Sequence, residues 1–146
     1  MEKIELSVDV TYRCLFSCLF CSSIDTLYPM DMQIDTAEKV INFIDAKNKL
    51  KNKNSVITIT GGEPLIFNEL SLFISEWTKN SCEVNLCTTG AIMKDENYWD
   101  RLSQAGLKSV RLSMHSVSSA KCKTIFGSKY SFDTVNSDLS PKKWTL

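Results

Sequence analysis

A predicted strand leads directly into a cysteine-rich loop at residues 4 to 21, IELSVDVTYRCLFSCLFC. From residue 4 to residue 11, apolar residues alternate with polar ones, and this alternation predicts a β-strand with one apolar face. The loop then carries three thiols, those of Cys14, Cys18 and Cys21. Because parallel α/β folds bind their ligands at the carboxyl ends of their strands, the position of this loop predicts a functional site.

Strands and helices alternate along the rest of the chain. Further strands are predicted in SVITITGGEP, EVNLCTTG and SVRLSMH, at residues 55–64, 83–90 and 109–115. Helices are predicted at residues 34–50, 68–80 and 94–106, and another is expected to begin within 131–140. Asp35 and Glu38 have the spacing of a capping box, Asn68 is expected to open the second helix, and Gly106 to close the third. Strands that are separated by helices usually pair in parallel through right-handed crossovers.

Each predicted strand also has a polar side. In chain order, the polar residues of the four strands are Ser7, Asp9 and Thr11; Thr58 and Thr60; Glu83, Asn85, Cys87 and Thr89; and Arg111, Ser113 and His115. A parallel sheet covered on both faces would have continuous apolar strands, and a closed eight-stranded barrel would have a bulky branched interior. We therefore predict an α/β fold, a wide and open barrel of parallel strands whose polar inner face holds a polar ligand. The alternative is a sheet with helices on one side and water on the other.

The composition limits the classes of partner. Lysine plus arginine and aspartate plus glutamate number 17 each, so the formal net charge is zero, which argues against nucleic acid or an anionic membrane as a partner. Neither a signal peptide nor an apolar run long enough to span a membrane is visible, so we expect a cytoplasmic protein. Residues 1–146 contain no linker or repeat, so one domain is expected. In a reducing compartment, clustered cysteines are more typical of metal binding or chemistry than of disulfides.

Three thiols suit a catalytic metal site better than a structural one. Structural zinc sites use four protein ligands, and Cys82 and Cys87 are poorly placed to supply a second pair. Iron–sulfur proteins that transfer electrons also use four cysteines per cubane cluster. Three thiolates would leave one coordination position open, as in catalytic metal sites. A domain that zinc stabilises remains the alternative.

Two motifs resemble those of the radical S-adenosylmethionine (radical SAM) enzymes. The first comprises Cys14, Cys18 and Cys21 with Phe20 before the last cysteine, and the second is the GGEP turn of Gly61–Pro64. They lie one β/α unit apart and each follows a predicted strand, as in that family. Weaker similarities are TTG at residues 88–90, Ser113 and His115 in the fourth strand, and FGSKYSFDTV at residues 126–135, so that the resemblance covers residues 4 to 136.

The resemblance implies two cofactors and a set of residues that bind them. A [4Fe-4S] cluster is expected on Cys14, Cys18 and Cys21, with S-adenosyl-L-methionine chelated to its fourth iron and cleaved to a 5'-deoxyadenosyl radical. The implied contacts to S-adenosylmethionine are Phe20 at the adenine, Glu63 at the amino group, and Gly61, Gly62, Pro64, Thr89 and Ser113. No catalytic residue is assigned beyond the cluster, and no role is assigned to Arg111, His115, Cys82, Cys87 or Cys122. Leu15 and Phe16 are expected to belong to the core.

The leading hypothesis is thus a radical SAM enzyme that is short on its C-terminal side, and the resemblance implies a partial (β/α) TIM-like barrel with about four β/α units. It would act on an unknown substrate, such as a peptide or small metabolite, and receive electrons from a flavodoxin or ferredoxin. The family usually adds a fifth and a sixth strand, which we do not find in the sequence, so a partner subunit that completes the barrel is one expectation. The alternatives are a non-catalytic metal- or cluster-binding module and an inactive fragment.

Overall fold

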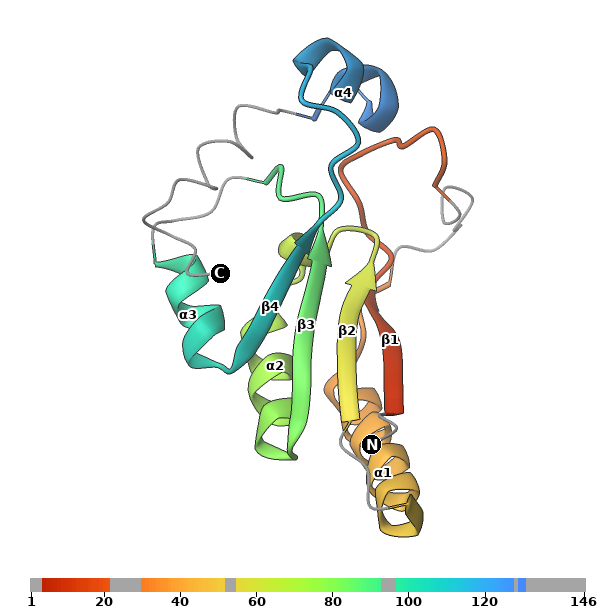
Figure 1. The fold of residues 1–146 in the computed structure, drawn as a ribbon, viewed down its shortest axis with the longest axis vertical. Helices are drawn as coiled ribbons and strands as arrows, with labels where there is room; N and C mark the ends of the chain where they lie inside the picture. The colour runs from red at the N-terminus through yellow and green to blue at the C-terminus, as the bar shows by residue number, and fades with distance from the viewer. Residues whose placement is uncertain (1–3, 22–29, 52–54, 93–96, 128, 131–146) are drawn as a thin grey trace.

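The computed structural model describes residues 4–21, 30–51, 55–92, 97–127 and 129–130. Strands and helices alternate along these residues (Figure 1). The strands are β1 (Ile4–Thr11), β2 (Ser55–Gly61), β3 (Cys82–Thr88) and β4 (Leu107–Leu112). The helices are α1 (Ile34–Lys51), α2 (Leu70–Lys79), α3 (Tyr98–Gln104) and α4 (Ser119–Phe126), with a 3-10 helix, η1, at Pro64–Ile66.

The strands form one parallel sheet in the order β1-β2-β3-β4. Ser7 on β1 pairs with Thr58, which pairs with Asn85, which pairs with Ser109 on β4. Each strand is thus beside the next one in sequence, and all carboxyl ends lie at the end of the sheet drawn uppermost in Figure 1. The prediction of an α/β fold with four parallel β/α units is confirmed.

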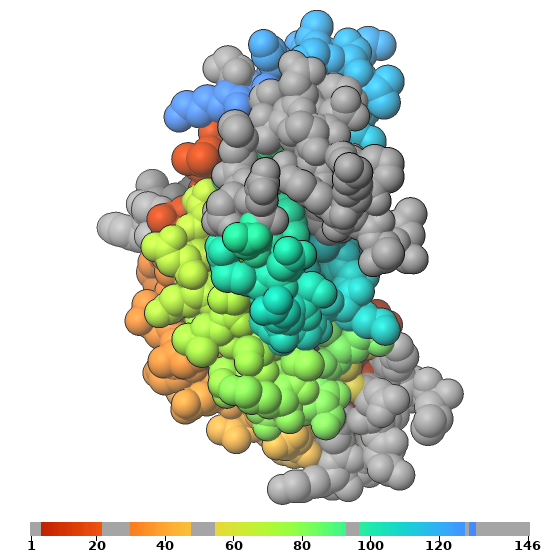
Figure 2. Space-filling model, turned by 90° about the vertical axis from the view of Figure 1, so that its left-hand side faces the viewer, coloured from red at the N-terminus to blue at the C-terminus, as the bar shows by residue number. Residues whose placement is uncertain are grey.

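Helices cover one face of the sheet. Figure 2 shows α1, α2 and α3 side by side over that face, and the main core lies between them and the strands. Ile57, Leu86 and Trp77 are fully buried there, and the Trp77 indole N–H donates to the carbonyl of Ala37 in α1 at 3.4 Å. The apolar side chains of the strands therefore fix which face the helices pack against.

The other face of the sheet carries the predicted polar side chains. Glu83, Asn85 and Cys87 are half-buried and alternate with fully or nearly buried neighbours along β3. The Ser109 hydroxyl donates to the Asn85 side-chain oxygen at 2.6 Å across the β3–β4 pair. The polar face predicted from the strand pattern is confirmed, and within the described residues it is open.

Two predicted helix caps are wrong. Helix α1 begins at Ile34, the first residue of the predicted range, and Asp35 lies in its first turn, where it pairs with Lys39 instead of capping the helix. Helix α2 has Glu69 and not Asn68 as its N-cap, because η1 and a turn precede the helix.

The predicted limits of the last strand are also wrong. The strand β4 begins two residues earlier than predicted because Gly106, at φ +104°, turns the chain directly out of α3 as expected for a helix-ending glycine. Ser113 and His115 follow the strand and do not belong to it. Helix α4 is not among the predicted elements, and the helix predicted within 131–140 lies outside the described residues. In the described part of the chain, no helix is both long and apolar enough to cross a membrane.

Candidate functional site

The cysteine loop leaves the carboxyl end of β1 and is held by the end of α4. The backbone N–H of Ser17 donates to the carbonyl of Phe126 at 3.0 Å, and that of Leu19 donates to the carbonyl of Ile125 at 3.0 Å. Because the last carbonyls of a helix have no partner within the helix, the loop supplies the donors that α4 lacks. Cys18 and Cys21 are joined by one further hydrogen bond, from the N–H of Cys21 to the carbonyl of Cys18 at 3.1 Å.

The three loop thiols are not in disulfides, and the charges of neighbouring groups affect the pKa values of Cys14 and Cys18. All six cysteines of the chain are described and none forms a disulfide. Burial raises the pKa of the Cys14 thiol, and the nearby charges of Glu63 and Cys21 raise it further. Burial also raises the pKa of Cys18, and the charges of Cys14 and Cys21 add to this effect.

Three reduced thiols at the carboxyl end of a parallel sheet are a donor set that fits an iron–sulfur cluster with one iron unligated by protein. Among the described residues, no three cysteine, histidine or acidic side chains are already gathered as a metal site. Binding a cluster would therefore require the loop side chains to turn toward one another.

The GGEP turn packs against the backbone at the start of the cysteine loop. The N–H of Gly62 donates to the carbonyl of Thr11 at 2.7 Å, and that of Glu63 donates to the carbonyl of Arg13 at 2.9 Å. A Cβ atom on Gly62 would lie 2.1 Å from the Arg13 oxygen, and one on Gly61 would lie 2.3 Å from the Thr11 oxygen. The close approach that these glycines permit is thus to the end of β1 and the residues after it, and it brings the two sequence motifs into direct contact.

The Glu63 carboxylate is fully buried and takes four hydrogen bonds from the protein. Its Oε1 accepts from the Leu65 N–H at 3.0 Å and from the Thr88 hydroxyl at 2.5 Å. Its Oε2 accepts from the N–H and the hydroxyl of Thr89, at 3.0 and 2.6 Å. A carboxylate has about four acceptor positions, so these donors fill them. The expected contact of Glu63 with an amino group stays a prediction, and it would require one of these donors to move.

Ser113 joins the same group of residues through its backbone. Its N–H donates to the carbonyl of Thr88 at 2.8 Å, and its hydroxyl lies 3.7 Å from the sulfur of Cys87. The structure thereby brings Glu63, Thr89 and Ser113 together at the carboxyl ends of β2, β3 and β4. These strand ends and the cysteine loop lie at the same end of the sheet (Figure 1).

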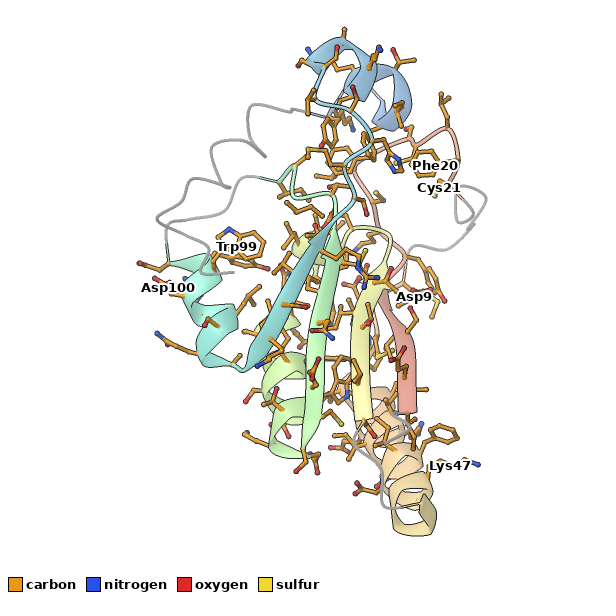
Figure 3. The ribbon with its side chains drawn as sticks, in the orientation of Figure 1. Asp9, Phe20, Cys21, Lys47, Trp99 and Asp100 are labelled. Carbon is orange, nitrogen blue, oxygen red and sulfur yellow. The ribbon has the colours of Figure 1, made fainter. Side chains whose placement is uncertain are left out.

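Phe20 belongs to an aromatic cluster beside the cysteine loop. Its ring is 58% exposed and lies 4.6 Å from the ring of His115, centroid to centroid. The cluster continues through Phe126, which stacks on Tyr130 at 4.4 Å. Figure 3 shows Phe20 and Cys21 at the same end of the molecule, far from Lys47 in α1. An exposed ring next to the loop is available to a ligand, and His115 is placed here as a ring partner.

Cys82 and Cys122 make hydrogen bonds to residues outside the cysteine loop, and Phe16 and Leu15 differ in how far they are buried. The buried thiol of Cys122 donates to the carbonyl of Ser116 at 3.0 Å, and that of Cys82 donates to the carbonyl of Asn80 at 3.7 Å. Phe16 packs on the aromatic cluster, as expected for a core residue. The expectation for Leu15 is wrong, since this side chain is 48% exposed on the loop.

A cavity of about 500 Å³ lies away from these residues, between β1 and α1. Its lining includes Leu6, Val40 and Phe43, and none of the predicted site residues. It is therefore not part of the site at the strand ends.

An ion pair that the sequence does not predict closes the base of the cysteine loop. Arg13 donates to both oxygens of Asp31, from Nε at 2.8 Å and from Nη2 at 2.7 Å. The two residues are 18 positions apart in the sequence, and no local spacing rule connects them. The only signal in the sequence is an arginine directly before the first cysteine.

Solved structures with a similar fold were found by comparison. A structure of BtrN in complex with AdoMet and 2-DOIA matches with a TM-score of 0.71 at 18% identity, over 98% of this chain and 54% of that chain. A structure of anSMEcpe with bound AdoMet matches with a TM-score of 0.72 at 19% identity, over 93% of this chain and 39% of that one. These matches establish that the fold of this chain corresponds to part of the barrel fold of those longer chains.

Sequence comparisons give the family. GTP 3',8-cyclase of Campylobacter jejuni is 32% identical over 126 residues, and that of Clostridium botulinum is 32% identical over 123 residues. Both alignments cover 82% of this chain, and the chain spans only 37% of the length of these relatives. The family model of the radical SAM superfamily matches residues 8–136, which include both sequence motifs. The chain therefore belongs to the radical SAM superfamily.

Proposed function

We propose that this chain is the part of a radical SAM enzyme that binds the [4Fe-4S] cluster and S-adenosylmethionine. The superfamily uses both cofactors. The observation that carries the proposal is a loop of three cysteines, none in a disulfide, packed by its backbone against the buried Glu63 turn. Together, the bound cluster and S-adenosylmethionine supply one-electron cleavage of a carbon–sulfur bond and abstraction of a hydrogen atom from the substrate.

Cys14, Cys18 and Cys21 would ligate three irons of the cluster. Apolar side chains of the loop, such as Leu19 and Phe20, would limit the access of water to the sulfurs and so influence the reduction potential. Both side chains are largely exposed, which leaves them free to cover a bound group.

The contacts to S-adenosylmethionine would come from the adjoining strand ends. Phe20 would pack against the adenine. The Gly61–Pro64 turn and Thr89 would surround the methionine moiety, and Ser113 would reach its carboxylate or the ribose. The positions of these groups around the carboxyl ends of β2, β3 and β4 support this assignment.

The substrate would lie over the polar face of the sheet, next to the cofactors. Hydrogen-bonding side chains such as Thr58, Asn85 and Ser109 suit a polar molecule. The relatives named GTP 3',8-cyclase make a nucleotide one candidate, alongside a peptide or another small metabolite. A flavodoxin or ferredoxin would supply the electron. The six cysteines, none of which is in a disulfide, support a cytoplasmic location.

The test is anaerobic reconstitution of the chain with iron and sulfide. We expect about four irons per chain, and release of 5'-deoxyadenosine when S-adenosylmethionine and dithionite are added. Cys14→Ala, Cys18→Ala and Cys21→Ala should each abolish both signals. Cys82→Ala, which changes a thiol at the opposite end of β3, is the matched control and should retain them.

Each outcome bears on a different part of the proposal. A loop-cysteine variant that keeps the full cluster spectrum would contradict the ligand assignment. A cluster that forms without release of 5'-deoxyadenosine would show that this chain binds the cluster but does not complete the reaction.

A further inference from the structure

We infer that Arg13 and Asp31 form a clamp that fixes the position of the cysteine loop relative to the Gly61–Pro64 turn. This inference rests on the proposed function, and it assigns a positioning role to two residues outside the sequence motifs. Arg13 donates two nearly parallel hydrogen bonds to the two carboxylate oxygens of Asp31, at 2.8 and 2.7 Å. Such bidentate pairing restrains the orientation of both groups as well as their distance.

The clamp lies where the two ends of the segment that carries all three cysteines come together. Asp31 also accepts from the Thr11 hydroxyl at 2.6 Å, and the backbones of Thr11 and Asp31 form an antiparallel bridge. On either side of this bridge, the N–H of Tyr12 donates to the carbonyl of Met30, and the N–H of Met32 donates to the carbonyl of Val10, both at 2.8 Å. The chain therefore leaves β1 and returns to it at one fixed point.

Arg13 also reaches the second motif. Its Nη2 donates to the carbonyl of Ile66 in η1 at 3.2 Å, and its own carbonyl accepts from the N–H of Glu63 at 2.9 Å. Cys14 follows Arg13 directly in the chain. The first cluster ligand is thus coupled by backbone and side-chain contacts to the turn that would surround S-adenosylmethionine.

The exposure of Arg13 and Asp31 indicates that the pair mainly positions the cysteine loop and contributes little to the stability of the fold. The side chains of Arg13 and Asp31 are 38% and 32% exposed. Ion pairs at such exposure contribute little to the free energy of unfolding. Breaking the clamp should consequently leave the fold and the three ligands in place but change the distance between the cluster and S-adenosylmethionine.

The test compares Arg13→Gln, Arg13→Lys and Asp31→Asn with the wild-type chain. Lys79→Gln is the matched control, because Lys79 forms an ion pair with Glu76 at 2.9 Å on α2, outside the site. In the Arg13→Gln variant we expect wild-type iron content, binding of S-adenosylmethionine weakened about tenfold, and a smaller change in the electron paramagnetic resonance spectrum on its addition. Arg13→Lys keeps the charge but not the paired hydrogen bonds, so its affinity should fall between those of the wild-type and Arg13→Gln proteins.

A readout on the apo protein separates the clamp from the proposed function. Alkylation of Cys14, followed by mass spectrometry, should be faster in Arg13→Gln and Asp31→Asn than in the wild-type and Lys79→Gln proteins. If the wild-type chain fails to bind a cluster while the difference in the alkylation rate of Cys14 is still observed, the proposed function is wrong, but the inference about the Arg13–Asp31 clamp is supported.

Two results would overturn the clamp. One is wild-type affinity for S-adenosylmethionine and wild-type alkylation rates in both Arg13→Gln and Asp31→Asn. The other is loss of iron in parallel with loss of the S-adenosylmethionine response in all three variants, which would indicate a role in folding of the loop alone. Far-ultraviolet circular dichroism identifies any variant that does not fold, and Asp31→Asn then tests the same hydrogen bonds from the other side.

Discussion

Replacing Glu63 by glutamine would test whether its buried carboxylate holds the site together. In the wild-type chain its two oxygens accept the N–H groups of Leu65 and Thr89 and the hydroxyls of Thr88 and Thr89. A glutamine keeps one oxygen and presents an NH₂ group to the other pair of donors. A threonine hydroxyl can rotate and accept from this group, but a backbone N–H can only donate.

The expected cost follows from this mismatch. One buried backbone donor loses its acceptor, at about 1 to 3 kcal/mol, and the remaining hydrogen bonds lose the benefit of a charged acceptor, at about 1 kcal/mol. We therefore expect Glu63→Gln to lower the free energy of unfolding by about 3 kcal/mol. For a chain of this size, that corresponds to a decrease in Tm on the order of 10 °C.

The assay is denaturant unfolding of the apo protein, followed by circular dichroism. Glu76→Gln, which changes a glutamate on the surface of α2, is the control and should stay within about 0.5 kcal/mol of the wild-type chain. An unfolding midpoint for Glu63→Gln equal to that of the wild-type chain, with an unchanged m-value, would refute the reasoning. It would mean that the four hydrogen bonds to the carboxylate do not contribute to stability.

Two further predictions concern Gly62 and Asp31, which both contact residues at the start of the cysteine loop. Gly62→Ala should lower the free energy of unfolding by about 2 to 3 kcal/mol, because the new methyl group would overlap the Arg13 carbonyl; a urea midpoint at the wild-type value would contradict this. Hydrogen bonds from Arg13, and to a smaller extent from Thr11, lower the pKa of Asp31, so its contribution to stability is complete above about pH 4 and disappears as the pH falls through the lowered value. The difference in free energy of unfolding between the wild-type chain and Asp31→Asn should therefore shrink on acidification below about pH 4; a difference that stays constant would contradict the assignment.

Most of the fold could be predicted from the strand pattern and the two motifs. Alternation of polar and apolar residues in Ile4–Thr11 and Cys82–Thr88 is set by the pleat, so it could be read without knowledge of tertiary contacts. The same pattern placed the cysteine loop and the GGEP turn at the carboxyl ends of neighbouring strands, where the structure has them.

The details of the site depended on contacts between distant residues. Nothing in the GGEP motif shows that the nearest neighbour of Gly62 is the carbonyl of Arg13, or that the Glu63 carboxylate faces Thr88 and Thr89. Helix α4 could have been found, since Ser118 precedes it as an N-cap and its side chain accepts from the N–H of Lys121. Gly106 was predicted to close α3, but the start of β4 directly after it could be placed only from the observed positive φ angle.

The hydrogen bonds between the cysteine loop and α4 have a consequence for the folding of the loop during synthesis. Ser17 and Leu19 leave the ribosome roughly a hundred residues before their acceptors at Phe126 and Ile125, an interval on the order of 5 to 20 s at typical rates of synthesis. During that interval the loop thiols are outside the tunnel without the helix that holds them. Premature capture of iron or oxidation of Cys14, Cys18 and Cys21 would be most damaging then, so delivery of the cluster is best timed after α4 has emerged.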